Sequence, residues 1–228
     1  NVGDSGHGTH VAGTVAAVSN NGVGVSGIAG GTGRNDGVKL MSCQIFSGGE
    51  GGSAAVSAEA IKYAADNGAS ILQCSWGYPA GAVTTDNAYA SGARIEKQAI
   101  DYFIATKNNA VLDGGLVIFA AGNDAKAMSG YPGAYRDYIS VTAFSPDYLP
   151  AYYTNYGPGC NVAAPGGDAY ISPSGSSAAQ VLSTLPSELY QSDYGYMQGT
   201  SMACPHVSGV AALGLSLSLI HISEPTRR

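Results

Sequence analysis

The sequence is poor in charge. Charged residues make up 11% of its 228 residues, against about 25% in an average globular protein. Acidic residues outnumber basic ones by 16 to 10, the net charge is −6 and the pI is near 5.0. No basic run precedes the last residues, so a nucleic-acid-binding scaffold is excluded. A chain with 45% hydrophobic residues and so little charge must bury most of its length, which also excludes a disordered segment.

Cysteines are few as well. Cys43, Cys74, Cys160 and Cys204 form no C-x-x-C pair and have no histidine at the spacing that a structural zinc site needs. We therefore expect no metal site built on them. Cys43 and Cys74 lie in apolar runs, which favours small buried side chains over a disulfide bond.

Long hydrophobic runs are also missing. The stretch from residue 207 to residue 222 is too short and too rich in serine for a membrane span. The chain starts at Asn1 without a charged region followed by an apolar one, so we expect any signal peptide to lie outside it.

Glycine, in contrast, is abundant, and 33 glycines indicate many tight turns and close backbone approaches. Coiled coils and helical bundles are therefore excluded. Strand-like apolar runs alternate with helical patterns, which predicts one α/β domain of three layers, a mostly parallel β-sheet with helices on both faces. The expected strands are residues 38–46, 70–75, 115–121, 138–144, 161–164 and 181–184, and the expected helices are residues 7–19, 53–67, 93–112 and 201–215.

The end of the chain differs from the segment before it. From Leu217 to Arg227 the residues resemble, at every position, the translation of a sequencing-library adapter. We expect residues 217–228 to be a non-native tail. The alternative is a native helix that continues from the apolar run at residues 209–215.

Three segments place reactive groups at the expected ends of helices and strands. They are Gly6-His7-Gly8-Thr9-His10-Val11-Ala12-Gly13, Ala120-Ala121-Gly122-Asn123 and Gly199-Thr200-Ser201-Met202-Ala203-Cys204-Pro205-His206-Val207-Ser208-Gly209. A serine hydroxyl becomes a good nucleophile only when a base takes its proton and donors hold the oxyanion that forms. A serine, a histidine and an amide are thus the minimum set for acyl transfer, and all are present.

Ser201 is expected at the start of a helix, with its backbone N–H pointing outward and Pro205 tolerated in the first turn. Taken alone, a helix-capping serine is the commoner explanation. His7 opens another helix between two glycines, where the neutral imidazole that a general base needs is favoured. His10 and His206 are interpreted as packed or hydrogen-bonded structural residues.

Asn123 follows an expected strand, at the carboxyl edge where open α/β sheets bind ligands. Its amide can donate hydrogen bonds without titrating. By itself, an asparagine in a turn would explain the residue better.

Together, and in this order, the three segments resemble the subtilisin-like serine proteases, the subtilase family. The resemblance covers residues 1–216 and includes Asn20-Asn21-Gly22, Gly27-Ile28-Ala29, Ser75-Trp76-Gly77, Tyr131-Pro132-Gly133-Ala134-Tyr135, Tyr153-Thr154-Asn155-Tyr156-Gly157 and Ala163-Ala164-Pro165-Gly166. It implies a subtilisin-like fold and a serine endopeptidase that works through an acyl-enzyme. On matching positions it implies His7 as general base, Ser201 as nucleophile, and Asn123 with the Ser201 N–H as the oxyanion hole.

The resemblance also implies how substrate binds. An extended polypeptide would pair its backbone with the segment that follows the second expected strand, and the side chain before the scissile bond would enter a pocket beside it. The substrate-binding residues implied are Ser75, Trp76, Gly77, Ala120, Ala121 and Gly122. Trp76 either caps a neighbouring subsite or is a buried core aromatic.

One part of the family pattern is missing. The triad needs an aspartate on a strand upstream of the histidine, and Asp4, in the approach to His7, does not match it. We therefore expect a catalytic-domain fragment, incomplete at its N-terminus and C-terminus, that is poorly stable and at best weakly active alone. The resemblance further implies a monomeric, secreted or cell-surface enzyme that requires no cofactor. A loop at Asn20 and Asn21 resembles the calcium loop of the family, which allows a structural calcium ion.

Three alternatives remain at this stage. The chain could be a catalytically silent subtilase-like domain that binds peptides, although it keeps His7, Asn123 and Ser201. An esterase of the α/β-hydrolase type would need G-x-S-x-G and a catalytic histidine after the serine, but Gly199-Thr200-Ser201-Met202-Ala203 lacks the second glycine and the candidate base His7 precedes the serine. Residues 22–27 match the dinucleotide-binding pattern G-x-G-x-x-G, but they follow an expected helix instead of a strand.

Overall fold

A parallel β-sheet forms the centre of the domain. The computed structural model describes residues 6–46, 52–106, 112–172 and 177–221. Four strands lie in the order β1 (Ile71–Cys74), β2 (Leu116–Ala120), β3 (Ile139–Phe144) and β4 (Val162–Pro165). All neighbours are parallel, with Cys74 opposite Phe119 and Ala120 opposite Val141. The loops that follow the strands therefore leave the sheet at one common edge.

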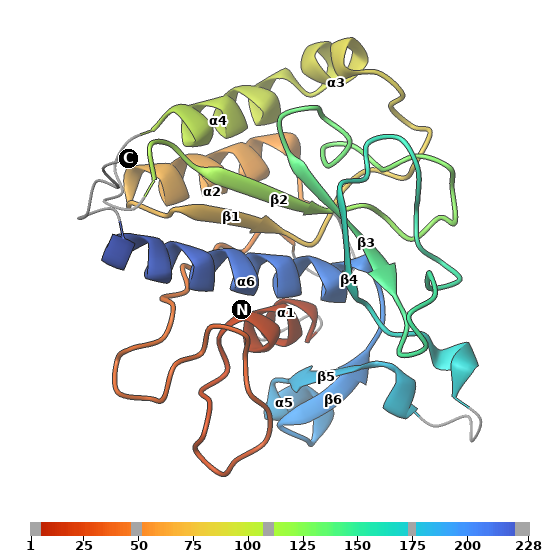
Figure 1. Ribbon diagram of the computed structural model, residues 1–228. Coiled ribbons are helices and arrows are strands. Elements are labelled where there is room, and N and C mark those ends of the chain that lie inside the picture. The colour runs from red at the N-terminus through yellow and green to blue at the C-terminus, as the bar shows by residue number, and fades with distance from the viewer. Residues whose placement is uncertain (1–5, 47–51, 107–111, 173–176, 222–228) are drawn as a thin grey trace, which may run out of the picture.

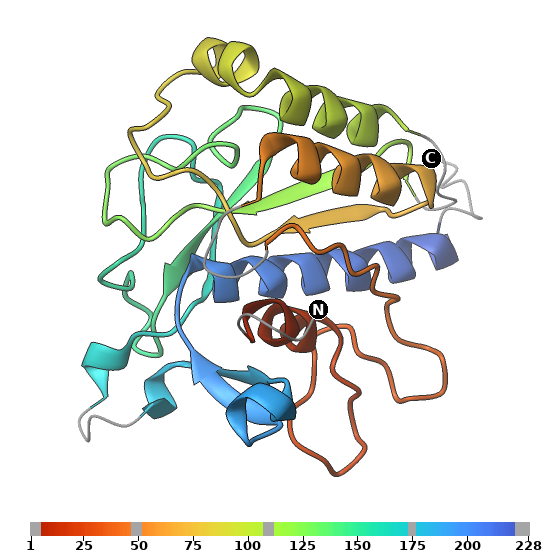
Figure 2. The same cartoon turned by 180° about the vertical axis from the view of Figure 1, so that it is seen from behind.

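Helices cover both faces of this sheet (Figures 1 and 2). α2 (Ala54–Asp66) and α4 (Arg94–Ala105) lie on one face, with α3 (Asp86–Gly92) ahead of α4. α6 (Thr200–His221) lies on the other face, and α1 (His7–Ala16) packs against it. Alternate residues of β2 face the two layers, because Phe119 packs in the cluster with α2 and α4 while Ile118 packs in the cluster with α6. The predicted three-layer α/β fold is confirmed.

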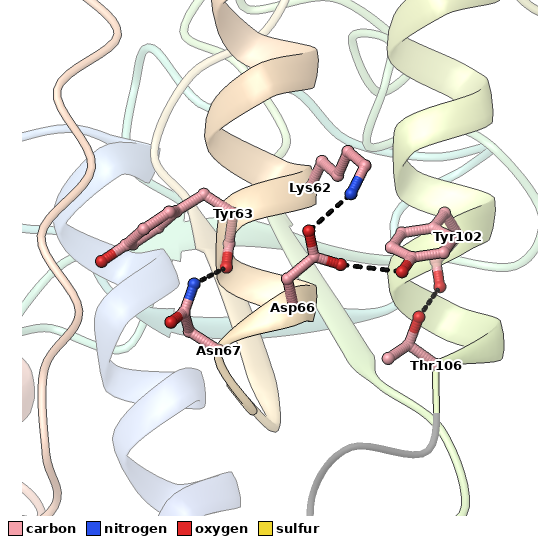
Figure 3. Close-up of polar contacts among 6 residues, drawn as sticks. All are labelled: Lys62, Tyr63, Asp66, Asn67, Tyr102 and Thr106. Carbon is pink, nitrogen blue, oxygen red and sulfur yellow. Dashed lines mark hydrogen bonds and ion pairs between the residues drawn. The ribbon is translucent and has the colours of Figure 1, made fainter.

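The outer surfaces of α2 and α4 are joined by an exposed polar cluster (Figure 3). Asp66 of α2 accepts a hydrogen bond from the Tyr102 hydroxyl of α4 at 2.7 Å and pairs with Lys62 at 2.5 Å. Because these groups are exposed to solvent, the ion pair contributes little to stability. The helix pair is held mainly by its apolar face, where Ile61 and Phe103 are buried.

A second, smaller sheet packs beneath α1. It is the antiparallel pair of β5 (Val181–Thr184) and β6 (Tyr194–Met197), with α5 (Ser187–Tyr190) between the two strands. The short 3-10 turns Ala169–Ile171 and Ser177–Ala179 precede it. Gly13 allows α1 to lie directly on β5, since a Cβ there would stand 2.1 Å from Thr184 Oγ1.

The expected strand at residues 38–46 is wrong, because the structure has no strand there. A strand is stable only when a neighbour takes up its backbone hydrogen bonds, and the outer edge of β1 has no strand partner in the described part of the chain. Apolar side chains in the segment remain exposed, Leu40 at 52% and Phe46 at 43%. Sequence reasoning also missed α3 and β6, and α6 runs beyond the predicted end at residue 215 to His221.

One charged side chain, Glu96 of α4, lies in the core with only 1% of its surface exposed. Its Oε1 accepts hydrogen bonds from the Tyr78 and Tyr89 hydroxyls, each at 3.0 Å. Burial raises the pKa of Glu96, and the two hydroxyl donors oppose that rise only in part.

This burial predicts a specific pH dependence of stability. A carboxyl group whose pKa is raised by folding stabilises the fold below its unfolded pKa of 4.5, and this contribution is lost as pH rises through the folded pKa. We expect the Glu96→Gln variant, which keeps an acceptor oxygen for both tyrosines, to lack this loss. Urea unfolding at pH 4 and pH 8 measures it, with exposed Glu59→Gln as the control. Equal pH profiles for wild type and Glu96→Gln would contradict the prediction.

Candidate active site

Ser201 is the second residue of α6 and is held against the segment that follows β1. Its Oγ–H donates to the Ser75 carbonyl at 3.3 Å, and the Ser75 hydroxyl donates to the Ser201 carbonyl at 2.7 Å. No hydrogen bond joins Ser201 to His7 among the described residues. The paired contacts fix the start of α6 at the carboxyl edge of the sheet.

Pro205 explains why the Ser201 carbonyl is available. Within an α-helix that carbonyl would accept from the N–H four residues later, and proline at that position has none. The Ser75 hydroxyl takes its place. Pro205 is the sixth residue of α6, and not in its first turn as we expected. A helical hydrogen bond is lost there, and a hydrogen bond from Ser75, directly after β1, replaces it.

Asn123 lies in the turn after β2, with its side chain oriented by Thr200. The backbone N–H and the hydroxyl of Thr200 donate to Asn123 Oδ1 at 2.8 and 2.9 Å. A backbone N–H can only donate, so the atom it meets is the amide oxygen and Nδ2 is left with both of its N–H groups. Gly122 N–H in turn donates to the Thr200 hydroxyl at 3.1 Å. Sequence reasoning missed Thr200, whose place directly before the serine was the available signal.

Two N–H donors border the same small space beside Ser201. A Cβ placed on Gly199 would lie 3.6 Å from Asn123 Nδ2 and 3.6 Å from the Ser201 backbone nitrogen. Gly199 has a φ of +145°, a conformation that side chains rarely adopt. Within the described residues, neither the Asn123 Nδ2 nor the Ser201 N–H has a recorded hydrogen-bond partner. Because Gly199 has no side chain, a space remains there that is flanked by the Asn123 Nδ2 and the Ser201 N–H.

His7 is the first residue of α1 and is half-buried. Burial lowers its pKa from 6.5, which favours the neutral imidazole. Burial is the main cause that lowers the pKa of His10, and the charges of His7 and His206 lower it further, so both of these imidazoles lie within electrostatic reach of His10. His206 Nδ1 is 2.8 Å from the Met202 carbonyl within its own helix.

His10 is fully buried and links α1 to the small sheet. Its Nε2 lies 3.0 Å from the Val181 carbonyl and 3.2 Å from the Gly195 carbonyl, so Nε2 carries the proton. The start of α1 is held as well, because Gly6 N–H donates to the Tyr190 hydroxyl at 3.1 Å. The β5–β6 pair therefore fixes the helix that carries His7, a role no local sequence pattern indicated.

The predicted substrate-binding residues follow β1 or lie at the end of β2 and directly after it, and two of them contact the start of α6. Ser75 contacts Ser201 directly, as described above, and Gly122 contacts Thr200. Trp76 is half-buried and packs edge-on against Phe119, with ring centroids 5.2 Å apart. Ala120 and Ala121, at 6% and 0% exposure, are packed in the interior. Gly77 is exposed. A substrate-binding role for these residues stays a prediction.

The loop that resembles a calcium loop offers few charged ligands. Asn21 Oδ1 accepts a hydrogen bond from the Val23 N–H at 2.9 Å. Among the residues that the structure describes, no three His, Cys, Asp or Glu side chains gather where they could hold a metal ion. None of the helices in those ranges is both long and apolar enough to cross a membrane.

Comparison with known proteins gives consistent results. The subtilase family (peptidase S8) matches residues 1–223. M-protease from Shouchella clausii (strain KSM-K16) is 32% identical over 209 residues, 92% of this chain and 44% of that protein. The thermophilic serine proteinase of Bacillus sp. (strain AK1) is 33% identical over 207 residues, 91% of this chain and 42% of that protein. The chain thus spans less than half the length of these two relatives. Among solved structures, the prenylagaramide maturation protease PagA superposes with a TM-score of 0.68 at 26% identity, covering 95% of this chain and 66% of PagA.

Proposed function

Since this chain belongs to the subtilase family, we propose that it forms the catalytic core of a serine endopeptidase that hydrolyses peptide bonds through an acyl-enzyme. Ser201 is the nucleophile, and its hydroxyl proton passes to the neutral imidazole of His7 as the bond to the substrate carbonyl carbon forms. His7 then returns the proton to the leaving amine, and water repeats the sequence on the acyl-enzyme.

The pair of free donors beside Ser201 carries this proposal. The carbonyl oxygen of the substrate becomes negatively charged in the tetrahedral intermediate, and it is stabilised by donors already fixed in place. Asn123 Nδ2 and the Ser201 N–H both border the space at Gly199, two residues before the serine. Thr200 holds the amide of Asn123 before any substrate arrives, so the donors need little reorganisation.

The third member of the triad is proposed to come from a strand that is not in this sequence. The outer edge of β1 and the segment at residues 38–46, which forms no strand, support this. One strand between them would take up the backbone hydrogen-bonding groups of both. Its aspartate would hold the tautomer of His7 and stabilise the imidazolium cation. Substrate would pair in extended form with residues 75–77, and the enzyme would be monomeric, secreted or at the cell surface, with calcium in a structural role only.

Labelling with a fluorophosphonate tests the proposal. The source locus is first resequenced beyond both ends by a library-free method, which also shows whether residues 217–228 belong to the gene. Two proteins are then expressed: residues 1–216 alone, and residues 1–216 joined to their natural upstream segment, called the joined protein below. We expect the joined protein to be labelled at Ser201 and to cleave a peptide anilide, and residues 1–216 alone to react weakly. A folded joined protein that does neither would favour the silent peptide-binding domain, and robust labelling of residues 1–216 alone would refute the need for the upstream aspartate.

The rate of labelling should also depend on pH through His7. The base works only when neutral, so the rate is lost as pH falls through the pKa of His7, which burial places below 6.5. An upstream carboxylate would raise that pKa. We expect the midpoint to lie below pH 6.5 in residues 1–216 and higher in the joined protein, measured as labelling rate against pH. Identical midpoints would contradict an aspartate partner.

A further inference from the structure

We propose that Asn155 is a positioning residue that fixes the turn carrying the oxyanion donor Asn123; this inference rests on the function proposed above. Asn155 lies between β3 and β4, and none of its surface is exposed. It touches no reacting atom in the proposed mechanism and acts on the main chain around Asn123.

The amide of Asn155 has all of its hydrogen-bonding capacity filled by this turn. Its Oδ1 accepts from the backbone N–H groups of Asp124 and Lys126, each at 3.0 Å. Its Nδ2 donates to the Ala121 carbonyl at 2.8 Å and to Asp124 Oδ2 at 3.1 Å. Two donors and two acceptor sites are the full capacity of an asparagine amide. Residues on both sides of Asn123 are therefore held by one side chain.

Backbone contacts and backbone strain point to the same role. The Asn155 N–H donates to the Gly122 carbonyl at 3.0 Å. A Cβ on Gly122 would lie 2.4 Å from Asn155 Nδ2, so glycine is needed for this approach. Ala125, two residues after Asn123, has a φ of +51°, which is unfavourable for a residue with a side chain. Such a turn persists only where its surroundings determine it.

Two independent supports thus define the direction of Asn123 Nδ2. Thr200 holds the amide oxygen of the side chain, and Asn155 holds the main chain from Ala121 to Lys126. Without Asn155 the Asp124 and Lys126 N–H groups would lose the side-chain acceptor that holds them, and the Ala121 carbonyl would keep only the Gly130 N–H. The turn would relax and Nδ2 would move away from the space at Gly199. The effect should appear in the transition state, where the donor is needed, and hardly in substrate binding.

A double-mutant cycle in the joined protein tests this. Asn155→Ala is expected to lower kcat about 10- to 100-fold, less than the roughly 10²–10³-fold loss known for removing such a donor in a subtilisin, with KM changed less than about threefold. In an Asn123→Ala background the same change should alter kcat less than about threefold, because the donor is already gone. Rates are expressed per active site, titrated with the fluorophosphonate. Equal losses in both backgrounds would overturn the proposal.

Two further variants separate positioning from stability. Asn155→Asp keeps the acceptor oxygen but not the donors, and it replaces Asn155→Ala in the cycle if the alanine variant does not fold. Asn161→Ala removes another side-chain amide, whose Oδ1 accepts a hydrogen bond of 2.7 Å from the Ser140 N–H. Asn161 makes no contact with the turn around Asn123 among the described hydrogen bonds, so this variant should leave kcat unchanged. A loss of stability without a loss of kcat in both Asn155 variants would show a structural role only.

A readout without turnover keeps this inference distinct from the proposed function. The side-chain amide signals of Asn123, assigned by their loss in Asn123→Ala, are followed by ¹⁵N–¹H NMR. We expect them to shift in Asn155→Asp and to stay in place in Asn161→Ala. If the joined protein proves inactive yet these signals shift, the proposed function fails while the positioning role holds. Unchanged signals would refute the positioning role.

Discussion

Replacing Ser201 by alanine is expected to remove fluorophosphonate labelling and to lower kcat of the joined protein by about 10⁶, the loss measured when the serine of a subtilisin is removed. The change deletes one oxygen at the start of α6 and leaves the Ser201 carbonyl in place to accept from Ser75. Stability should therefore change little, and the loss should fall on kcat. Peptide-anilide kinetics and mass spectrometry of the labelled protein measure both effects.

The control for this variant is a serine on the same helix. Ser216 is exposed, and its hydroxyl donates only to the Leu213 carbonyl, so Ser216→Ala should keep full labelling and activity. Labelling that persists in Ser201→Ala would place the nucleophile at another residue. Activity that falls equally in both variants would point to a disturbed helix α6 instead of a lost nucleophile.

Replacing Phe119 by alanine is expected to cost about 3–5 kcal/mol of the free energy of unfolding, as is typical for a buried phenylalanine. Phe119 lies in the middle of the sheet with no exposed surface. Its ring contacts Trp76 edge-on at 5.2 Å and Tyr138 at 5.7 Å, centroid to centroid. The cavity left by the change would also free Trp76, which lies in the predicted substrate segment, so KM should rise as stability falls.

The control is an aromatic residue at the surface, in the turn after β4 and so at the other end of the sheet from β1. Tyr170 is 78% exposed, so Tyr170→Ala should cost about 1 kcal/mol or less. Urea unfolding of the joined protein, followed by far-ultraviolet circular dichroism, compares the two variants. Similar losses at both positions would contradict the packing described for β2.

The strand predictions show where reading the sequence works and where it fails. Residues 115–121 and 138–144 form β2 and β3 nearly as expected, because a strand buried on both faces is apolar throughout. Residues 38–46 are also rich in apolar residues, although they include Lys39 and Gln44, and they form no strand because strand formation also needs a partner. β6 was missed since Tyr194-Gly-Tyr-Met197 is short, contains a glycine and is never fully buried.

The candidate site could be proposed from the sequence alone. His7, Asn123 and Ser201 stand in short motifs whose residue types and order resemble those of the subtilase family, and that resemblance implies a part in acyl transfer for each. The α/β class could be predicted as well, because apolar strand-like runs alternate with helical patterns along the chain, while composition only excluded coiled coils, helical bundles and disorder.

How that chemistry is held in place depends on contacts that follow no periodicity along the chain. Thr200 meets Asn123 across 77 residues, and Ser75 meets Ser201 across 126. Asn155 contacts Asp124 across 31 residues. In the sequence, Asn155 was only one residue of a family motif, and no role could be assigned to it. Local patterns report which face of a helix or strand is buried, but a hydrogen bond between distant segments exists only once the sheet has brought their ends to one edge.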